Sequence, residues 1–484
     1  MTTPTRRDFF QSALGAAAIA ATPNSLAKFC EQSKAPAYRV DKPLRQLQQE
    51  FVNLRFGMFL HFNMATFQDR EWGDPNDAPS VFNPSNLDTA HWARAAKSAG
   101  MTWGCLTTKH HDGFCIWPTS TKVASVKDTP HRTDVVKAYS DSFRAEGLKV
   151  ALYYSILDLR NDVRHFNVTK DKITLIKEQL AELLTNYGEI IAMIFDGWNA
   201  PWSRITYEEV PFHEIYELVK RLQPNCLVSD LNSSQYPSSA LYYTDIKAFE
   251  QNAGQKVPGD SKIPALSCVT LTDGWFWKQA DKEGKLKPVT QVVDEWLIPL
   301  NRIHCNLILN AAPNREGKLA ENIVKRLGEI GQAWQNPGPN SNIDENVVIT
   351  TANLATAQKI HASDSPDTVG PDLANDGNFR SGFFFPEGQR SGWLEIDLAN
   401  AKEFNTLALV EPVGSSEEYK ESRISRYRFQ RWSGGEWLDL VAGNSPSRVQ
   451  IHRIPRVSAQ KVRLLIDASR EMPHIAEIGI YNEP

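Results

Sequence analysis

The sequence has little of what marks a metalloprotein, a redox protein or a nucleic-acid-binding protein. Its six cysteines include no CxxC pair, and its 11 histidines show no HExxH or other spacing typical of metal ligands. A net charge of −4 gives no basic field for nucleic acid or an anionic membrane. Beyond the N-terminal region, no apolar run reaches the roughly 20 residues of a membrane span. We therefore predict no metal, no cofactor, no nucleic-acid partner and no membrane span.

The cysteines lie mostly among apolar residues. Cys105, Cys226 and Cys305 stand in apolar runs, so we expect them to be small buried side chains. A disulfide between Cys105 and Cys115 stays open, because spacing alone does not decide it.

The N-terminus has the pattern of an export signal. Thr5-Arg-Arg-Asp-Phe-Phe-Gln11 resembles the twin-arginine consensus, a weakly apolar run extends from Ala13 to Ala21, and Ser25-Leu-Ala27 offers a small-x-small cleavage site. We predict a signal peptide at residues 1–27 and a periplasmic or secreted bacterial protein. The alternative is a basic amphipathic start to the mature protein.

From about residue 50 to residue 340, short apolar runs alternate with helical segments such as Asp171–Tyr187, whose apolar residues fall on one face. Buried strands of a parallel sheet have this continuous apolar character. We therefore expect a (β/α)8-like barrel in a domain at residues 28–340. The predicted strands are Phe56–Leu60, Trp103–Thr107, Val150–Tyr154, Ile191–Phe195, Cys226–Ser229, Ile246–Phe249 and Asn306–Leu309, with a less clear one near Gly274–Trp277.

The composition changes at Gln335–Asn342, where turn-forming residues predict a linker. Residues 341–484 contain short alternating runs such as Trp393–Leu398 and Lys461–Ile466, and no long helical pattern. This pattern is typical of a β-sandwich. The predicted fold is thus of the α/β class, with a barrel followed by a C-terminal β-sandwich.

Several of the predicted barrel strands lead into residues that can bind or react. The carboxyl ends of barrel strands meet at one mouth, where such barrels hold their active sites. One polar residue at a strand end is most often a cap, but a set that converges on one mouth favours a functional site. The set consists of His61, His110, His111, Tyr153, Tyr154, Asp196 and Glu250.

Two carboxylates without a metal motif indicate glycoside hydrolysis. A retaining mechanism needs a nucleophile and a proton donor about 5 Å apart. Asp196 suits the nucleophile because polar neighbours would keep it ionised. Glu250 suits the acid because Phe249 precedes it, and apolar surroundings raise the pKa of a carboxyl group. Trp198, close to Asp196, offers a flat aromatic face for a sugar.

The barrel segments resemble the α-L-fucosidases of glycoside hydrolase family 29, in the family's order and over about 260 residues. The resemblance implies Asp196 as the nucleophile of a retaining mechanism. It also implies a fucose subsite of His61, Glu71, Trp72, His110, His111 and Tyr153. The matching segments are Phe56–Phe62, Glu71–Asp74, Thr108–Phe114, Leu152–Ser155, Phe195–Gly197 and Asn306–Pro313.

The acid/base is less directly implied, because its position varies across the family. One branch places a glutamate where this chain has Asn252, and asparagine cannot act as a carboxylic acid. Glu250 is the nearest substitute, with Asp245 and Asp273 as further candidates. Glu71-Trp-Gly-Asp74 resembles the branch that acts on α-1,3 and α-1,4 linkages, whereas Asp196-Gly-Trp198 fits that branch less well, so the linkage stays open.

The C-terminal region resembles discoidin-like or galactose-binding-like sandwiches, through Asp372–Gly377 and Trp393–Leu398. The resemblance implies a carbohydrate-binding module, and a packing module without a ligand is the alternative.

The resulting hypothesis is a secreted, retaining exo-α-L-fucosidase that acts on fucosylated oligosaccharides or glycoconjugates. One alternative is a barrel glycosidase for a different sugar. The other is a catalytically impaired carbohydrate-binding protein, in which Asn252 would mark a lost acid.

Overall fold

The structure is a computed structural model that describes residues 41–282, 284–413 and 421–484. The predicted signal peptide at residues 1–27 and Cys30 lie outside the described residues.

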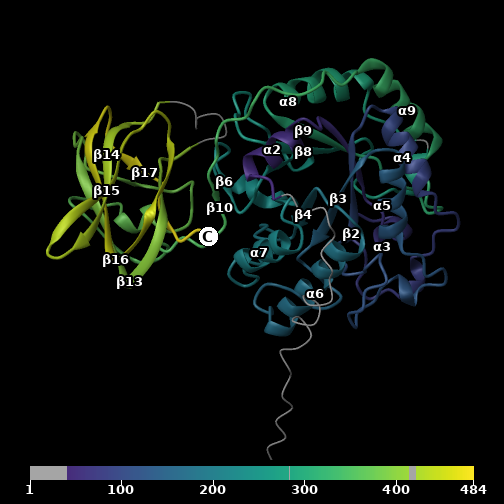
Figure 1. The fold of residues 1–484 in the computed structure, drawn as a ribbon, viewed down its shortest axis with the longest axis horizontal. Helices are drawn as coiled ribbons and strands as arrows, with labels where there is room; N and C mark the ends of the chain where they lie inside the picture. Colours follow the sequence, from purple (N-terminus) through teal and green to yellow (C-terminus); the bar gives the residue numbers. More distant parts are fainter. Residues whose placement is uncertain (1–40, 283, 414–420) are drawn as a thin grey trace, which may run out of the picture. The chain divides into compact units, whose positions relative to one another are not determined.

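Eight parallel strands form one nearly closed sheet in the order β5-β4-β3-β2-β1-β9-β8-β7 (Figure 1). The edge strands β5 and β7 approach each other through hydrogen bonds from Asp245 N to Val228 O and from Ser229 Oγ to Ile246 O. The predicted barrel is therefore confirmed. Its strands are β1 Phe56–Leu60, β2 Trp103–Lys109, β3 Lys149–Ser155, β4 Ala192–Asp196, β5 Leu227–Asp230, β7 Lys247–Glu250, β8 Ala265–Thr270 and β9 Cys305–Asn310.

Seven of the predicted strands agree with the structure to within two residues. The eighth prediction, Gly274–Trp277, is wrong: the strand is β8, and residues 274–277 form a loop beyond it. Ser267 and Thr270 interrupt the apolar run of β8. The loop at residues 274–277, by contrast, contains Trp275, Phe276 and Trp277, and so it has the apolar character of a buried strand.

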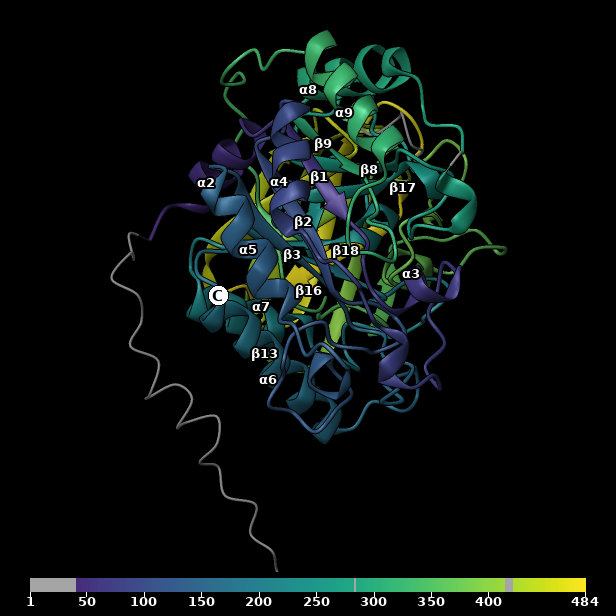
Figure 2. The same cartoon turned by 90° about the vertical axis from the view of Figure 1, so that its right-hand side faces the viewer.

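Helices α4, α5 and α9 lie on the outer side of the sheet (Figures 1 and 2). Side chains cap several of them: Asp88 accepts from His91 N at the start of α4, and Thr169 accepts from Lys172 N at the start of α6. The helix predicted at Asp171–Tyr187 is α6, within one residue. The α-helices are α2 Leu44–Val52, α3 Met64–Gln68, α4 Thr89–Ser98, α5 Val135–Ala145, α6 Lys170–Asn186, α7 Phe212–Leu222, α8 Ile298–Arg302 and α9 Glu321–Ala333.

The barrel departs from strict alternation at one side. Residues 231–246 and 251–264, all of them described, contain no α-helix, so β5, β7 and β8 follow one another through loops and short 3-10 turns. None of the helices in the described part of the chain has the length and apolarity that crossing a bilayer requires.

Side chains alternate between the barrel interior and the layer beneath the helices, as the strand period of two requires. Phe59, Trp103 and Tyr153 pack in the interior, whereas Met58 and Leu60 pack outward. The cysteines at 105, 115, 226, 268 and 305 are all buried and free. The buried positions predicted for Cys105, Cys226 and Cys305 are confirmed, and the open disulfide between Cys105 and Cys115 is not formed.

The C-terminal region is an antiparallel β-structure, which confirms the predicted sandwich. Two long strands, β13 and β16, pair with register shifts, and β13 takes β11 as a second neighbour near its start and β18 near its end. β10 pairs in parallel with the short β6 (Leu241–Tyr242). The strands are β10 Val348–Ile349, β11 Lys359–Ala362, β12 Phe383–Phe384, β13 Gly392–Val410, β14 Ile424–Ser433, β15 Glu436–Asn444, β16 Val449–Ser469, β17 His474–Ile475 and β18 Glu477–Tyr481.

Candidate active site

A cavity lies at the carboxyl ends of the barrel strands. It contains every residue that the sequence predicts for the site except Trp198 and Tyr154, whose buried hydroxyl contacts Lys109 and Gln179 outside the cavity. The lining residues are Phe59, His61, Glu71, Trp72, His110, His111, Tyr153, Asp196, Trp202, Leu231, Glu250 and Trp275.

Asp196 is the last residue of β4, and hydrogen-bond donors surround its carboxylate. Tyr153 Oη donates to Oδ2 at 2.8 Å, Gly197 N donates to Oδ1 at 2.7 Å, and Asn232 Nδ2 lies 3.3 Å from Oδ1. Gly197 has φ +68°, and a Cβ there would lie 2.8 Å from Leu157 Cβ. Only glycine fits this turn, which holds an amide hydrogen against the carboxylate.

Glu250 is the last residue of β7 and lines the same cavity. Burial, together with the negative charge of Asp196, raises the pKa of its carboxyl group to about 7, although a hydrogen bond from Trp275 acts in the opposite direction. A carboxyl group with this pKa is largely protonated at slightly acidic pH. It can therefore deliver a proton inside the cavity.

The other acids that the sequence offered do not line the cavity. Asp245 is fully buried, where it pairs with Lys220 Nζ at 2.6 Å and accepts from Tyr216 Oη at 2.8 Å. The side chain of Asp273 is 89% exposed. Asn252 donates to Thr270 Oγ1 at 2.8 Å and does not reach the cavity either.

Three histidines form one wall of the cavity. The His110 and His111 rings lie 3.9 Å apart between centroids, and His61 lies 6.0 Å from His110. Burial lowers the pKa of His61 to about 3. For His111, burial and the positive charge of Lys109 outweigh the opposite effect of Asp196, and the pKa is lowered to about 4. Both side chains are therefore neutral at neutral pH, and they can accept a hydrogen bond at one ring nitrogen.

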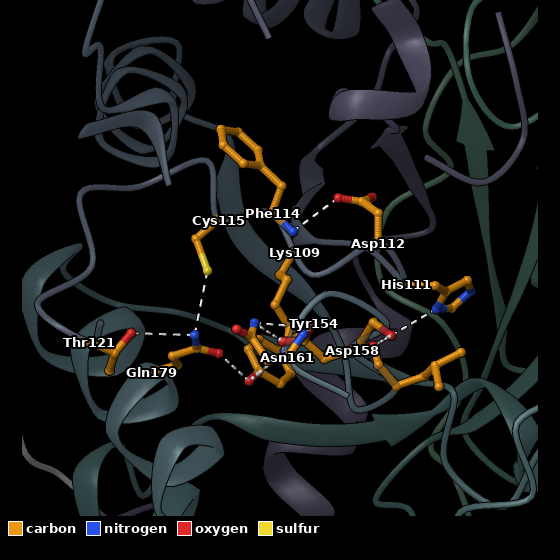
Figure 3. A network of polar contacts seen from close by, with 12 residues as sticks. Lys109, His111, Asp112, Phe114, Cys115, Thr121, Tyr154, Asp158, Asn161 and Gln179 are labelled. Carbon is orange, nitrogen blue, oxygen red and sulfur yellow. Dashed lines mark hydrogen bonds and ion pairs between the residues drawn. The ribbon is translucent and has the colours of Figure 1, made fainter. Parts of the chain in front are cut away.

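A buried polar network lies close to His111 (Figure 3). Lys109 Nζ lies 3.1 Å from Asp158 Oδ2 and 3.0 Å from Tyr154 Oη, and both members of the ion pair are fully buried. Asn161 donates to both oxygens of Asp158. Because every charged atom of the pair has partners, the pair can fix the backbone that carries His110 and His111.

The rim of the cavity consists of the Glu71 carboxylate, which has two hydrogen-bonding partners, and two exposed tryptophan rings. Glu71 Oε2 accepts from Trp275 N at 2.9 Å, and Lys278 Nζ lies 2.5 Å from Oε1. The rings of Trp72 and Trp202, 41% and 45% exposed, meet at 5.0 Å between centroids. Exposed aromatic faces at a cavity mouth suit the C–H surfaces of sugars.

Trp198 is not part of the cavity, and its predicted role in binding is wrong. The side chain is fully buried, its indole N–H donates to Val210 O at 3.1 Å, and its ring packs against Phe212. The indole that reaches the cavity from this loop belongs to Trp202. Sequence reasoning also missed Phe59, Leu231 and Trp275. Phe59 and Trp275 fall in segments that the sequence predicts as strands, Phe56–Leu60 and Gly274–Trp277, and Leu231 falls in no predicted element.

The described residues contain no cluster of three or more histidine, cysteine, aspartate or glutamate side chains that could hold a metal ion. The side chains of the cavity supply three carboxyl groups, neutral histidines and a tyrosine; of the carboxyl groups, that of Glu71 is paired with Lys278.

Known proteins resemble this chain over nearly its full length. The family model of α-L-fucosidases matches residues 24–338. α-L-Fucosidase 1 of Arabidopsis thaliana is 27% identical over 462 residues, which cover 90% of this chain and 86% of the plant protein. Two solved structures share the fold at 24% identity. A glycoside hydrolase 29 family member from an unknown rumen bacterium has a TM-score of 0.53 over 91% of this chain and 77% of its own, and α-L-fucosidase isoenzyme 1 from Paenibacillus thiaminolyticus has a TM-score of 0.52 over 88% and 100%.

Proposed function

This chain belongs to the α-L-fucosidase family of glycoside hydrolases, family 29, and on that premise we propose that it is a retaining exo-α-L-fucosidase. Its substrate would be terminal α-linked L-fucose on oligosaccharides or glycoconjugates. One observation carries the proposal: Asp196 and Glu250 line the same cavity, and the pKa of the Glu250 carboxyl group is raised to about 7.

The two carboxyl groups have different surroundings, and each suits a different role. Asp196 accepts hydrogen bonds from Tyr153 and Gly197, which orient the carboxylate without giving it a proton. Glu250 is buried beside that negative charge, and this favours its protonated form. In our proposal Asp196 is the nucleophile and Glu250 is the acid/base.

The proposed reaction proceeds in two displacements. An oxygen of Asp196 attacks the anomeric carbon while Glu250 protonates the departing glycosidic oxygen, which leaves a β-linked glycosyl-enzyme and the free alcohol. Glu250, now ionised, takes a proton from water, and the water oxygen displaces Asp196 from the anomeric carbon. Two inversions release α-L-fucose and restore both carboxyl groups.

The pH dependence of kcat/KM on a fucosylated trisaccharide tests this assignment. The first step needs protonated Glu250, whose pKa is about 7. We therefore expect kcat/KM to fall as the pH rises through this value, by about tenfold per pH unit beyond it. The Glu250→Gln variant should lose this alkaline limb, whereas Asp273→Asn, which changes an exposed carboxylate, should keep it. An unchanged alkaline limb in Glu250→Gln would assign the acid to another group.

Export by the twin-arginine route is also part of the proposal, supported by the motif at Arg6 and Arg7. Replacing both arginines with lysine should keep the uncleaved protein in the cytoplasm of a bacterial host that has this pathway. The measurement is fractionation with an immunoblot, and the unmodified chain is the control. Periplasmic product from the double variant would contradict the proposal.

A further inference from the structure

Two polar residues beside the cavity, Ser155 and Asn310, take no part in the proposed reaction. They belong to Leu152–Ser155 and Asn306–Pro313, two of the segments that resemble the α-L-fucosidase family. Both side chains are fully buried at the ends of strands, β3 for Ser155 and β9 for Asn310. Each contacts one ring nitrogen of a cavity histidine.

Asn310 determines which nitrogen of His61 carries the proton. Its Nδ2 donates to the carbonyl oxygen of Trp275 at 2.7 Å, and a carbonyl can only accept, so the amide orientation is fixed. Oδ1 then faces His61 Nδ1 at 2.7 Å. Because Oδ1 is an acceptor, His61 Nδ1 must hold the hydrogen.

Ser155 determines the proton position of His111 by the same logic. Its hydroxyl has one hydrogen, which it donates to Leu157 O at 2.7 Å. The oxygen therefore presents a lone pair to His111 Nδ1, also at 2.7 Å. This assigns the hydrogen of neutral His111 to Nδ1.

The other ring nitrogens are then bare acceptors. His111 Nε2 lies 3.5 Å from Asp196 Oδ2. Because the ring is neutral, this contact joins two acceptors and is no ion pair. His61 Nε2 has no hydrogen-bond partner among the residues that the structure describes. Both histidines are over nine-tenths buried and line the cavity. A hydroxyl group of a ligand in the cavity can donate a hydrogen bond to each of these acceptors.

We propose that Ser155 and Asn310 are positioning residues that hold His111 and His61 as Nδ1–H tautomers, so that both Nε2 atoms accept hydrogen bonds from sugar hydroxyl groups. The wall formed by His61, His111 and Asp196 thus presents acceptors only. This wall favours a polyol as ligand, because the hydroxyl groups of a polyol can donate hydrogen bonds to these acceptors. That the polyol is fucose rests on the proposed function, whereas the tautomer assignments are independent of the proposed function.

The direct test is a long-range ¹H–¹⁵N NMR spectrum of ¹⁵N-histidine-labelled enzyme at pH 7 without substrate. Signals are assigned by the loss of one histidine at a time in His61→Asn and His111→Asn. We expect both residues to be protonated at Nδ1 and bare at Nε2. Protonation at Nε2 of either residue in the unmodified enzyme would overturn the assignment for that residue.

The Ser155→Ala variant tests the cause. Without the hydroxyl, the Nδ1–H form of His111 loses its acceptor, and Asp196 Oδ2 offers one to an Nε2 hydrogen. We expect the Nε2–H form of His111 to appear and the KM for an aryl α-L-fucoside to rise. Ser229→Ala is the matched control, because Ser229 is also buried on a strand and donates to a carbonyl, that of Ile246. An unchanged His111 tautomer in Ser155→Ala would exclude Ser155 as its determinant.

The Asn310→Asp variant tests the contact between Asn310 and His61 through the pH dependence of kcat/KM. A carboxylate 2.7 Å from Nδ1 should raise the pKa of His61 by roughly 2 units. The ionisable groups that face His61 are His110, His111 and Tyr153, and they are unchanged. Below the new pKa, protonated Nε2 can no longer accept, so the acid limb of kcat/KM should move to higher pH.

Asn306→Asp is the control for a buried charge on the same strand. Asn306 lies four positions before Asn310, donates to Phe51 O at 2.6 Å and accepts from Trp103 Nε1 at 3.3 Å, so its environment is closely similar. We expect Asn306→Asp to leave the acid limb in place. If both variants move it equally, or neither does, the proposed role of Asn310 is wrong. Correct tautomers in an inactive enzyme would instead contradict only the proposed function.

Discussion

Replacing Asp196 with glycine should lower kcat on an aryl α-L-fucoside by on the order of 10⁴-fold or more, because no covalent glycosyl-enzyme can form. The fold should persist, since Asp196 is a strand-end residue at the cavity and not part of the core. Turnover assays with circular dichroism on the same preparation measure both quantities.

Azide makes this experiment specific for the nucleophile. In Asp196→Gly, azide can enter the vacated space and displace the aryl alcohol directly, so one inversion should yield β-L-fucosyl azide. Asp273→Asn is the control, because its carboxylate is exposed outside the cavity, and it should keep nearly full activity. High residual activity of Asp196→Gly without azide would place the nucleophile elsewhere.

Glu250→Gln should separate substrates by the quality of their leaving groups. A general acid contributes typically 10²–10⁴-fold when the leaving alcohol is weakly acidic and little when it departs unaided. We therefore expect hydrolysis of a fucosylated trisaccharide to fall by about 10³-fold. A dinitrophenyl α-L-fucoside should still form the covalent intermediate quickly, and stopped-flow absorbance should show a burst before slow turnover.

The second step of this variant is also diagnostic. Azide needs no base, so it should accelerate release of the intermediate and yield α-L-fucosyl azide, the product of two inversions. Equal losses on good and poor leaving groups, with no azide product, would remove Glu250 from the role. Asp245 and Asp273 lie outside the cavity, so neither is in a position to replace Glu250 as the acid/base.

The sequence was informative wherever burial alone determines the pattern. Strands such as Phe56–Leu60 are buried along their full length, so their apolar runs identify them directly. Because parallel strands share one carboxyl edge, the convergence of His61, His111 and Asp196 on one cavity followed from the strand assignment alone.

The loops could not be predicted in the same way. Trp198 and Trp202 stand four residues apart in one loop, and both have side chains that suit a sugar. Positive φ angles at Gly197 and Asn199 turn the chain, so that Trp198 packs in the core and Trp202 reaches the cavity. Composition carries no signal for this choice, because it depends on the backbone turn.

The polar contacts behind the site show a similar limit. Sequence motifs included Ser155 and Asn310 but gave no reason for them. The reason is the acceptor to which each side chain donates: the Ser155 hydroxyl donates to Leu157 O, and the Asn310 amide donates to Trp275 O. The hydrogen bond from Asn310 joins a strand to a loop far away in the sequence, and the one from Ser155 depends on the local path of the backbone, so neither could be predicted from the sequence.

The most direct test of the proposed reaction is the anomeric configuration of the first product, followed by ¹H NMR during rapid hydrolysis of an aryl α-L-fucoside by the unmodified enzyme. Double displacement through Asp196 predicts that α-L-fucose appears first and that the β anomer grows in only by mutarotation. If β-L-fucose appears first, or if the aryl α-L-fucoside is not hydrolysed at all, the central claim is contradicted.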